Sequence, residues 1–223
     1  MTAVVSCTNI KKIYKQGTID VVALAGVDLT VEQGDFVCLS GPSGSGKTTL
    51  LNIIGGLDMP SAGEISVAGN MLHTMSKAQL AEMRLQHVGF VFQAYNLIPV
   101  LTAQENVEMV MQMQGVSKRE RGRRARQVLK EVGLEGMENR KPPELSGGQQ
   151  QRVAVARAIV SNPKLVLADE PTANLDSKTA ENLIDLMRHM NSEHGVTFVI
   201  STHDPRVMLH AKRNLKMEDG RLV

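Results

Sequence analysis

The sequence predicts an α/β fold with a mostly parallel sheet core, an antiparallel β subdomain and an α-helical subdomain. A short apolar strand, a glycine-rich loop and a helix are expected in turn between residues 35 and 54. Two more apolar segments, 88–92 and 164–168, end at polar residues, as buried parallel strands do where ligands bind. The stretch 94–139 lacks β-branched runs and is rich in Met, Gln, Glu and Arg, which predicts helices.

Composition sets limits on the class of protein. The 223 residues are 42% hydrophobic and 22% charged, which suffices for one large domain or a domain with a subdomain. The formal net charge of +2 does not favour nucleic acid as a partner. Cys7 and Cys38 lie in apolar contexts without metal-ligand spacing, so buried thiols in a reducing compartment are expected. No signal peptide and no membrane-spanning segment are predicted.

The first third of the chain reads mainly as strands. Residues 4–14 and 21–31 predict two strands joined by a turn at 16–18, and residues 64–68 predict a third after a breaker-rich connection. A small antiparallel sheet beside the core is therefore expected. Tyr14 ends the first strand, and its ring is either a half-buried packing group or a platform for a nucleotide base.

The phosphate-binding pattern G-x-x-x-x-G-K-[ST] organises this region. Glycines let the backbone bend close to an anion where a Cβ would block it. The lysine of the pattern can reach the outer phosphates, its threonine can ligate Mg²⁺, and the helix over 49–54 points its positive end at the same place. The residues are Gly41, Pro42, Ser43, Gly44, Ser45, Gly46, Lys47, Thr48 and Thr49.

The middle of the chain offers one polar strand end and two helical faces with open interpretations. A helix over 77–85 and a strand over 88–92 deliver Gln93 at the carboxyl end of the strand. The methionine-rich segment 105–114 is either core or an apolar surface for a partner helix. The basic run 118–126 continues into one amphipathic helix, which favours a solvated face over a nucleic-acid site.

A second anion-seeking helix start lies about a hundred residues after the first. Ser146 and the N–H groups that follow it open a helix over 150–160, which Pro163 stops. The strand over 164–168 then ends in paired carboxylates. Asp169 is placed to hold Mg²⁺ directly or through water, and Glu170 to polarise an attacking water, although two acids after a strand can also simply begin a loop.

These motifs together resemble an ATP-binding-cassette (ABC) transporter ATPase, with its P-loop, RecA-like core, over essentially the whole chain. The signature pentapeptide is the most specific feature: Leu145, Ser146, Gly147, Gly148 and Gln149. The resemblance implies ATP and Mg²⁺ as ligands. It also implies that Tyr14 stacks on adenine and that Asp176 contacts the second subunit. The catalytic residues that it implies are Gln93, Glu170 and the switch histidine, His203. The residues that it implies as metal ligands are Thr48, Gln93 and Asp169.

The resemblance also implies partners. It places the signature of one subunit over the loop of another, so a homodimer with ATP at the interface is expected, together with a transmembrane permease on the cytoplasmic face of the cell membrane. The division is a nucleotide-binding core with the β subdomain, 1–93 and 160–223, and a helical subdomain, 94–159. The permease contact is expected on exposed apolar residues after Gln93: Tyr95, Leu97, Leu101 and Met109.

Segments 51–58, 89–93 and 168–176 resemble the macrolide-exporter and lipoprotein-releasing subgroup. A P-loop kinase or GTPase has no reason to carry the signature, and the guanine-reading N-K-x-D pattern is absent. The hundred residues between the nucleotide motifs are too few for a DNA-repair type of coiled coil, and no cassette repeat indicates a translation factor. The remaining alternative is a mechanotransmitting ATPase that acts on a cell-wall or division enzyme through its membrane partner.

Overall fold

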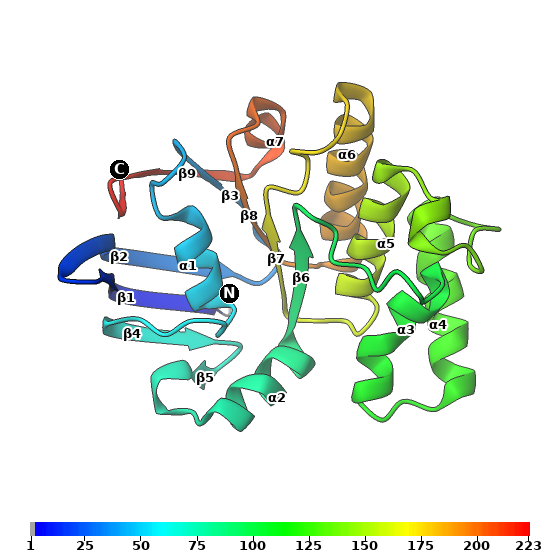
Figure 1. Ribbon diagram of the computed structural model, residues 1–223, viewed down its shortest axis with the longest axis horizontal. Coiled ribbons are helices and arrows are strands. Elements are labelled where there is room, and N and C mark those ends of the chain that lie inside the picture. Colours follow the sequence, from blue (N-terminus) through cyan, green and yellow to red (C-terminus); the bar gives the residue numbers. More distant parts are fainter. Residues whose placement is uncertain (1–2) are drawn as a thin grey trace.

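The computed structural model describes residues 3–223 as two sheets with helices around and between them (Figure 1). Met1 and Thr2, which begin the segment examined for a signal peptide, lie outside the described residues. Across the part of the chain that is described, no helix combines the length and apolarity needed to cross a membrane.

The smaller sheet is antiparallel and has the strand order β2-β1-β4-β5, as the turn pattern predicted. Its long ribbon pairs Tyr14 with Val21 near the tip. The strands are β1 (Ala3–Gln16), β2 (Ile19–Glu32), β4 (Ala62–Val67) and β5 (Asn70–Met71).

The larger sheet has the order β10-β9-β3-β8-β7-β6, and all its pairs are parallel except β10 with β9. Because the carboxyl ends of parallel strands meet at one edge, β3, β6, β7 and β8 deliver their polar end residues to the same side. The strands are β3 (Phe36–Ser40), β6 (Val88–Phe92), β7 (Leu165–Asp169), β8 (Phe198–Thr202), β9 (Arg213–Glu218) and β10 (Arg221–Leu222).

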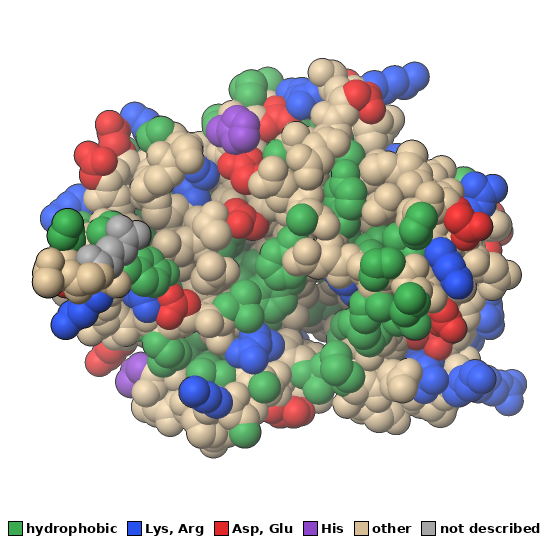
Figure 2. All heavy atoms as spheres, in the orientation of Figure 1, with side chains coloured by type: hydrophobic (Ala, Val, Ile, Leu, Met, Phe, Trp, Pro, Cys, Tyr) green, Lys and Arg blue, Asp and Glu red, His purple; other side chains and the backbone are tan. Residues whose placement is uncertain are grey.

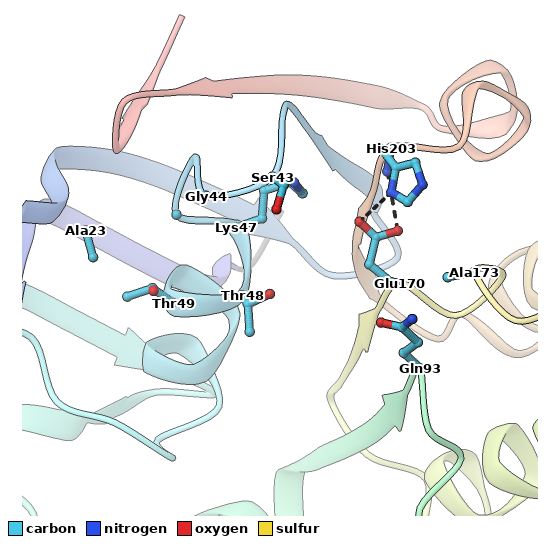
Figure 3. A pocket seen from close by; sticks show the side chains of 11 residues that line it. Ala23, Ser43, Gly44, Lys47, Thr48, Thr49, Gln93, Glu170, Ala173 and His203 are labelled. Carbon is cyan, nitrogen blue, oxygen red and sulfur yellow. Dashed lines mark hydrogen bonds and ion pairs between the residues drawn. The ribbon is translucent and has the colours of Figure 1, made fainter.

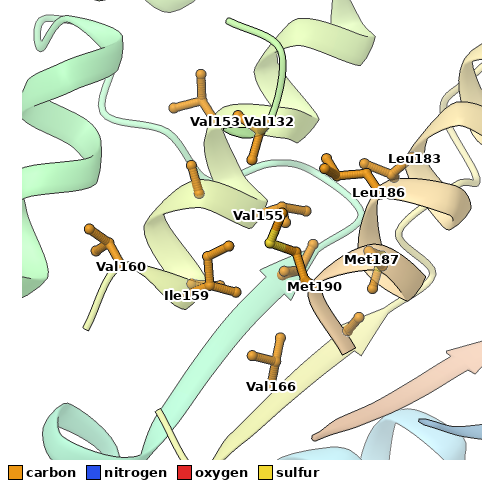
Figure 4. Close-up of a cluster of buried hydrophobic side chains, with 14 of the residues drawn as sticks. Val132, Val153, Val155, Ile159, Val160, Val166, Leu183, Leu186, Met187 and Met190 are labelled. Carbon is orange, nitrogen blue, oxygen red and sulfur yellow. The ribbon is translucent and has the colours of Figure 1, made fainter. Parts of the chain in front are cut away.

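Helices cover both faces of the larger sheet (Figure 1). Alternation along β3 shows the division: Val37 and Leu39 join a core with α1 and the smaller sheet, whereas Phe36 and Cys38 join a core with α3 to α6. Figure 4 shows part of this second core, where side chains of α5 and α6 meet Val166 of β7. The helices are α1 (Lys47–Ile54), α2 (Lys77–His87), α3 (Ala103–Met113), α4 (Lys118–Glu131), α5 (Gly147–Ile159), α6 (Ser177–His194) and α7 (Pro205–His210), with short 3-10 turns η1 (Leu72–Thr74) and η2 (Pro142–Glu144).

Two expectations about the helical region need correction. Residues 94–102 are not helical, and Tyr95 and Asn96 adopt left-handed backbone angles with φ of 59° and 51°. The helix expected from residue 150 begins three residues earlier, because the Ser146 side chain accepts from the Gln149 N–H and caps it. The basic run lies on α4 as predicted, where Glu120 binds two of its arginines.

The expected burial of the cysteines is confirmed, because Cys7 and Cys38 are buried free thiols. Burial raises the pKa of each to about 12.

Close packing joins α5 to β6: a Cβ on Gly89 would lie 2.2 Å from the Ala158 carbonyl oxygen. The helix that begins within the signature is therefore fixed against β6, the strand that precedes Gln93.

Candidate active site

A cleft of about 660 Å³ opens where the strand ends of the larger sheet meet the start of α1 (Figure 3). It brings together side chains from the glycine-rich loop and from the ends of β6, β7 and β8. The lining residues are Ala23, Ser43, Gly44, Gly46, Lys47, Thr48, Thr49, Gln93, Glu170, Ala173 and His203. The loop and these three strand ends, which are far apart in the sequence, thus form one site.

The loop needs glycine at its two ends. Gly41 has φ of 144°, and a Cβ there would lie 2.2 Å from the Met217 carbonyl oxygen. Gly46 has φ of 102°, and its Cβ would lie 2.6 Å from the Ala23 carbonyl oxygen. The loop therefore packs directly against the backbones of β9 and β2, which leaves no room for a side chain at either glycine. Lys47 is 8% exposed, and its Nζ donates to the carbonyls of Gly41 and Pro42 at 2.8 and 3.0 Å.

The hydroxyl of Thr48 and the carboxylate of Asp169 lie side by side, although they are 121 residues apart. Thr48 Oγ1 donates to Asp169 Oδ1 at 3.1 Å, and Ser201 Oγ donates to the same carboxylate oxygen. Ser201 is fully buried on β8, so it fixes the orientation of Asp169 from the neighbouring strand. Oxygen ligands of this kind suit Mg²⁺, which takes one or two protein ligands and completes its shell with phosphates and water.

Glu170 and His203 form an acid–imidazole pair at the edge of the cleft. His203 Nδ1 lies 3.0 Å from Glu170 Oε1, and the backbone N–H of His203 donates to Glu170 Oε2 at 3.4 Å. Glu170 has φ of 46° and its N–H donates to the Ser201 carbonyl, so the backbone turns sharply at the end of β7. The Glu170 side chain is 18% exposed and that of His203 is 73% exposed, so the imidazole is the more accessible partner, and Figure 3 shows the carboxylate directed at it.

Gln93 reaches the same cleft from β6. Its side-chain amide donates to Asn174 Oδ1 at 3.5 Å, and Asn174 Nδ2 returns a bond to the Gln93 carbonyl at 3.0 Å. The segment after β6 is thus tied to the loop that carries Asn174. A buried residue of α5, Gln151, reinforces this link by donating to the carbonyls of Phe92 and Pro171 at 3.4 and 2.7 Å.

The pentapeptide at 145–149 contributes none of the residues that line this cleft. Ser146 is exposed at the start of α5, in a capping box with Gln149. Asp176 caps α6 in a similar way, accepting from the Thr179 N–H and hydroxyl, and these bonds hold the pKa of its carboxyl below the usual range. The structure therefore brings the loop, Gln93, Asp169, Glu170 and His203 together, and leaves the signature apart.

A scan against family models matches residues 24–173 to the family described as ABC transporter. This chain belongs to the ABC transporter family. The cassette is 46% identical over 216 residues to the lipoprotein-releasing system ATP-binding protein LolD of Chromohalobacter salexigens, covering 97% of this chain and 91% of that protein. It is also 46% identical to an uncharacterized ABC transporter ATP-binding protein of Thermotoga maritima, covering 100% and 94%.

A third relative of the cassette is larger. The macrolide export ATP-binding/permease protein MacB of Rhodopirellula baltica is 45% identical over 214 residues, which are 95% of this chain and 31% of that protein. Solved structures of the cassette MJ0796 superpose with a TM-score of 0.90 and cover 98% of this chain and 96% of theirs. One, 45% identical, is a dimeric post-hydrolysis state with ADP and Pi, and the other, 44% identical, is also dimeric.

Tyr14 of the cassette is not among the residues that line the cleft, and it is 38% exposed. Its hydroxyl donates to Asp58, and Lys12 lies over its ring. Burial and Asp58 raise the pKa of the phenol, while the nearby Thr49 hydroxyl, itself part of the cleft, opposes the rise. The ring therefore stands next to the phosphate-binding helix.

The exposure expected for the apolar residues after Gln93 is wrong. Tyr95, Leu97, Leu101 and Met109 are all half-buried, and Leu97 packs against the core. Buried Arg157 on α5 holds this segment by donating to the carbonyls of Tyr95 and Asn96. Burial lowers the pKa of this arginine.

Several contributors escaped sequence reasoning. Ser201, Gln151 and Arg157 act on the site through side-chain contacts that no motif records. One usable signal was present for Gln151: Ala154, Val155 and Ala158 follow it by three, four and seven residues, so it shares their buried helix face, where a polar side chain requires hydrogen-bond partners. Ala23 entered the cleft through the pairing of β2, which the sequence alone did not place beside the loop.

Proposed function

We propose that this cassette is a nucleotide-binding subunit that hydrolyses ATP and drives a separate transmembrane permease by ATP-dependent closure of a homodimer. The observation that carries the proposal is the split between two regions. The cleft gathers the phosphate loop, an acidic strand end and the Glu170–His203 pair, whereas the signature lies outside it on the same chain. A site of this kind is completed by a second copy in head-to-tail symmetry.

Within the cleft, each residue has a role that its position supports. Lys47 and the loop amides bind the phosphates, and Tyr14 stacks on the base. Glu170 polarises the attacking water, and His203 contacts the γ-phosphate and orients that carboxylate. We assign Mg²⁺ to Thr48, Gln93 and Asp169, since the contact between Thr48 and Asp169 already pairs the required oxygens. The ion would neutralise charge on the β- and γ-phosphates.

Two copies would then enclose two ATP molecules, each between the loop of one and the signature of the other. Ser146 and the N–H groups at the start of α5 suit a phosphate from the partner's site. Asp176, which begins α6 next to this region, is placed to contact the partner. MJ0796, which superposes on this chain, is dimeric, with ADP and Pi in its post-hydrolysis state. That likeness supports the same assembly here.

The permease contact belongs, in this proposal, to an apolar groove of about 600 Å³ between α2 and α3. Leu57 (49% exposed), Met113 (60% exposed) and Phe90 of β6 are among the residues that line it. Figure 2 shows hydrophobic side chains gathered on the surface between α2 and α3. Because β6 also ends at Gln93, a permease helix seated here would act directly on the catalytic segment. A relative is named as an ATP-binding/permease protein, which supports a permease as the occupant.

Charged substitutions test this groove. Leu57→Asp and Met113→Asp should stay folded, because both side chains are exposed, and should lose co-purification with the permease. Leu209→Asp, on the 84% exposed Leu209 of α7, is the matched control and should keep it. Co-purification that survives both groove changes would place the contact elsewhere.

We also retain the division into a nucleotide-binding core with the β subdomain (1–93 and 160–223) and a helical subdomain (94–159), and a position on the cytoplasmic face of the cell membrane. Relatives act in lipoprotein release and macrolide export by name, which favours transport. The alternative is mechanotransmission to a cell-wall or division enzyme. Reconstitution with the permease separates the two, since transport alone moves or releases a molecule from the bilayer.

Phosphate release from ATP and Mg²⁺ tests the central activity. The purified chain should hydrolyse ATP with a specific rate that rises with protein concentration, because a second copy completes each site. Glu170→Gln should lower the rate by about 100-fold or more while ATP binding persists. A Glu170→Gln protein that turns over ATP at the wild-type rate would contradict the proposal.

A further inference from the structure

The loop 58–61 holds one edge of β1 where sheet pairing stops. The pairing of β1 with β4 ends at Lys11 opposite Ala62. Beyond that point, the Ser61 N–H donates to the Lys11 carbonyl at 2.7 Å, and the Ile13 N–H donates to Ser61 Oγ at 3.0 Å. Two hydrogen bonds to Ser61 therefore hold the part of β1 that carries Tyr14 against this loop.

Asp58 binds two side chains of the same strand, one with each carboxylate oxygen. Lys12 Nζ donates to Oδ1 at 2.6 Å and to the Met59 carbonyl at 2.7 Å, and the Tyr14 hydroxyl donates to Oδ2 at 2.7 Å. The Lys12 ammonium also lies 4.8 Å from the centroid of the Tyr14 ring. The Lys12 side chain is 12% exposed and Asp58 31%, so the three groups form a partly sheltered cluster.

The pKa shifts of Asp58 and Tyr14 agree with these hydrogen bonds. Partial burial alone would raise the pKa of the Asp58 carboxyl, but the hydrogen bonds from Lys12, Tyr14 and the Met59 N–H outweigh it and lower the pKa. Burial, followed by the bond to Asp58, raises the pKa of the Tyr14 phenol. The carboxylate thus stays an acceptor and the phenol a donor near neutral pH.

The same loop is anchored to the phosphate-binding helix. The N–H groups of Leu57 and Asp58 both donate to the Asn52 carbonyl on α1, at 2.8 and 3.2 Å. α1 begins with Lys47 and Thr48, so a short chain of hydrogen bonds runs from the helix that binds phosphates to the ring of Tyr14.

We propose that Asp58 and Lys12 are positioning residues for the purine base of ATP: they fix the Tyr14 ring at a set place relative to the phosphate loop. Lys12 covers part of the ring, and the 38% exposure of Tyr14 leaves surface for a base. An aromatic platform held in its binding orientation loses less conformational entropy when the base stacks. This inference rests on the proposed role of Tyr14 as the base platform.

The test compares ATP with inorganic tripolyphosphate, which has the phosphates without the base. Tyr14→Phe keeps the ring and removes the bond to Asp58, and Asp58→Ala removes it from the other side. Each should raise the KM for ATP by roughly 3- to 10-fold with little change in kcat, as expected when one charge-assisted hydrogen bond no longer orients a side chain. The double variant should have a KM for ATP no higher than that of the single variant with the larger increase, because both changes remove the same hydrogen bond. Inhibition by tripolyphosphate should be unchanged, and Glu64→Gln, at an exposed acid of β4, is the control.

Each other result has one meaning. A wild-type KM in both Tyr14→Phe and Asp58→Ala, with a raised KM in Tyr14→Ala, overturns the positioning role and leaves the platform. A wild-type KM in Tyr14→Ala removes the platform itself, and with it this inference. If tripolyphosphate inhibition weakens in parallel with the KM, the loop supports the phosphate site in general, and the base-specific role is wrong.

Discussion

The starts of α1 and α5 are both helix ends that favour anions, yet their surroundings differ. At α1, Lys47 and Thr48 line a cleft, and Asp169 and Glu170 of the same chain stand opposite them. At α5, Ser146 is exposed, and its capping box with Gln149 satisfies backbone N–H groups at the helix start. Neither residue lines the cleft that contains Glu170 and His203. The proposed function accounts for this difference, because it treats the two helix starts as halves of a site that two copies of the chain complete.

The two regions are nevertheless mechanically joined within the chain. Gln151 of α5 binds the backbone next to Gln93 and the backbone next to Glu170, and Gly89 lets α5 pack directly on β6. We therefore expect a movement of α5 to affect the ends of β6 and β7. The predictions below separate what each region does alone from what the connection does.

The largest effect is expected on the α1 side. Lys47→Ala should lower ATP turnover by about 100-fold or more, since it removes the charge aimed at the phosphates. The fold should persist, because Lys47 contributes two bonds to loop carbonyls and no core volume. Phosphate release and thermal unfolding measure the two properties, and full turnover would remove the loop from the mechanism.

A smaller effect is expected for the connection. Gln151→Met keeps the volume but leaves the carbonyls of Phe92 and Pro171 without this donor, which should cost about 1–3 kcal/mol of stability and slow turnover. The control is Gln150→Met, because Gln150 donates only to the Leu145 carbonyl beside its own helix start. Equal turnover in the two variants would show that the connection does not serve catalysis.

The contrast between motif and contact explains how far the sequence could predict this molecule. The parallel core, the antiparallel sheet, the glycine loop and the strand ends at Gln93, Asp169 and Glu170 followed from local patterns. His203 was assigned through the family resemblance, and Ala23 and Ala173 of the cleft were not predicted. The irregular course of 94–102 did not follow from local patterns, since it depends on Arg157, which holds the left-handed Tyr95 and Asn96 from 62 and 61 residues away. Composition favoured helix there, and a tertiary contact prevailed.

Side-chain exposure was the second limit. Leu97 and Met109 share the apolar character of Met113, and only packing distinguishes them: the first two are half-buried and Met113 is 60% exposed. Likewise, no spacing rule connects Tyr14 to Asp58 across 44 residues. These contacts depend on how β1 and the loop 58–61 meet in three dimensions.

The smallest effect on the isolated chain is expected at the α5 start. Ser76 and Ser146 have the same capping box with Gln79 and Gln149, so replacing either serine by Ala should lower stability by about 1 kcal/mol. Ser146→Ala alone should also weaken ATP-driven dimer closure. Equal closure in both variants, measured by size or cross-linking, would restrict Ser146 to helix capping.

Mixed dimers test the shared site most directly. Glu170→Gln is present in every chain, so that the closed dimer accumulates. In the separated arrangement one chain carries Lys47→Ala and its partner Ser146→Arg; both changes fall in one site, and the other site stays whole. In the combined arrangement one chain carries both changes and its partner neither, so each site loses one half. Two affinity tags isolate each pair, and cross-linking measures closure with ATP. The separated pair should close more than the combined pair, whereas equal closure in the two arrangements would contradict the shared site.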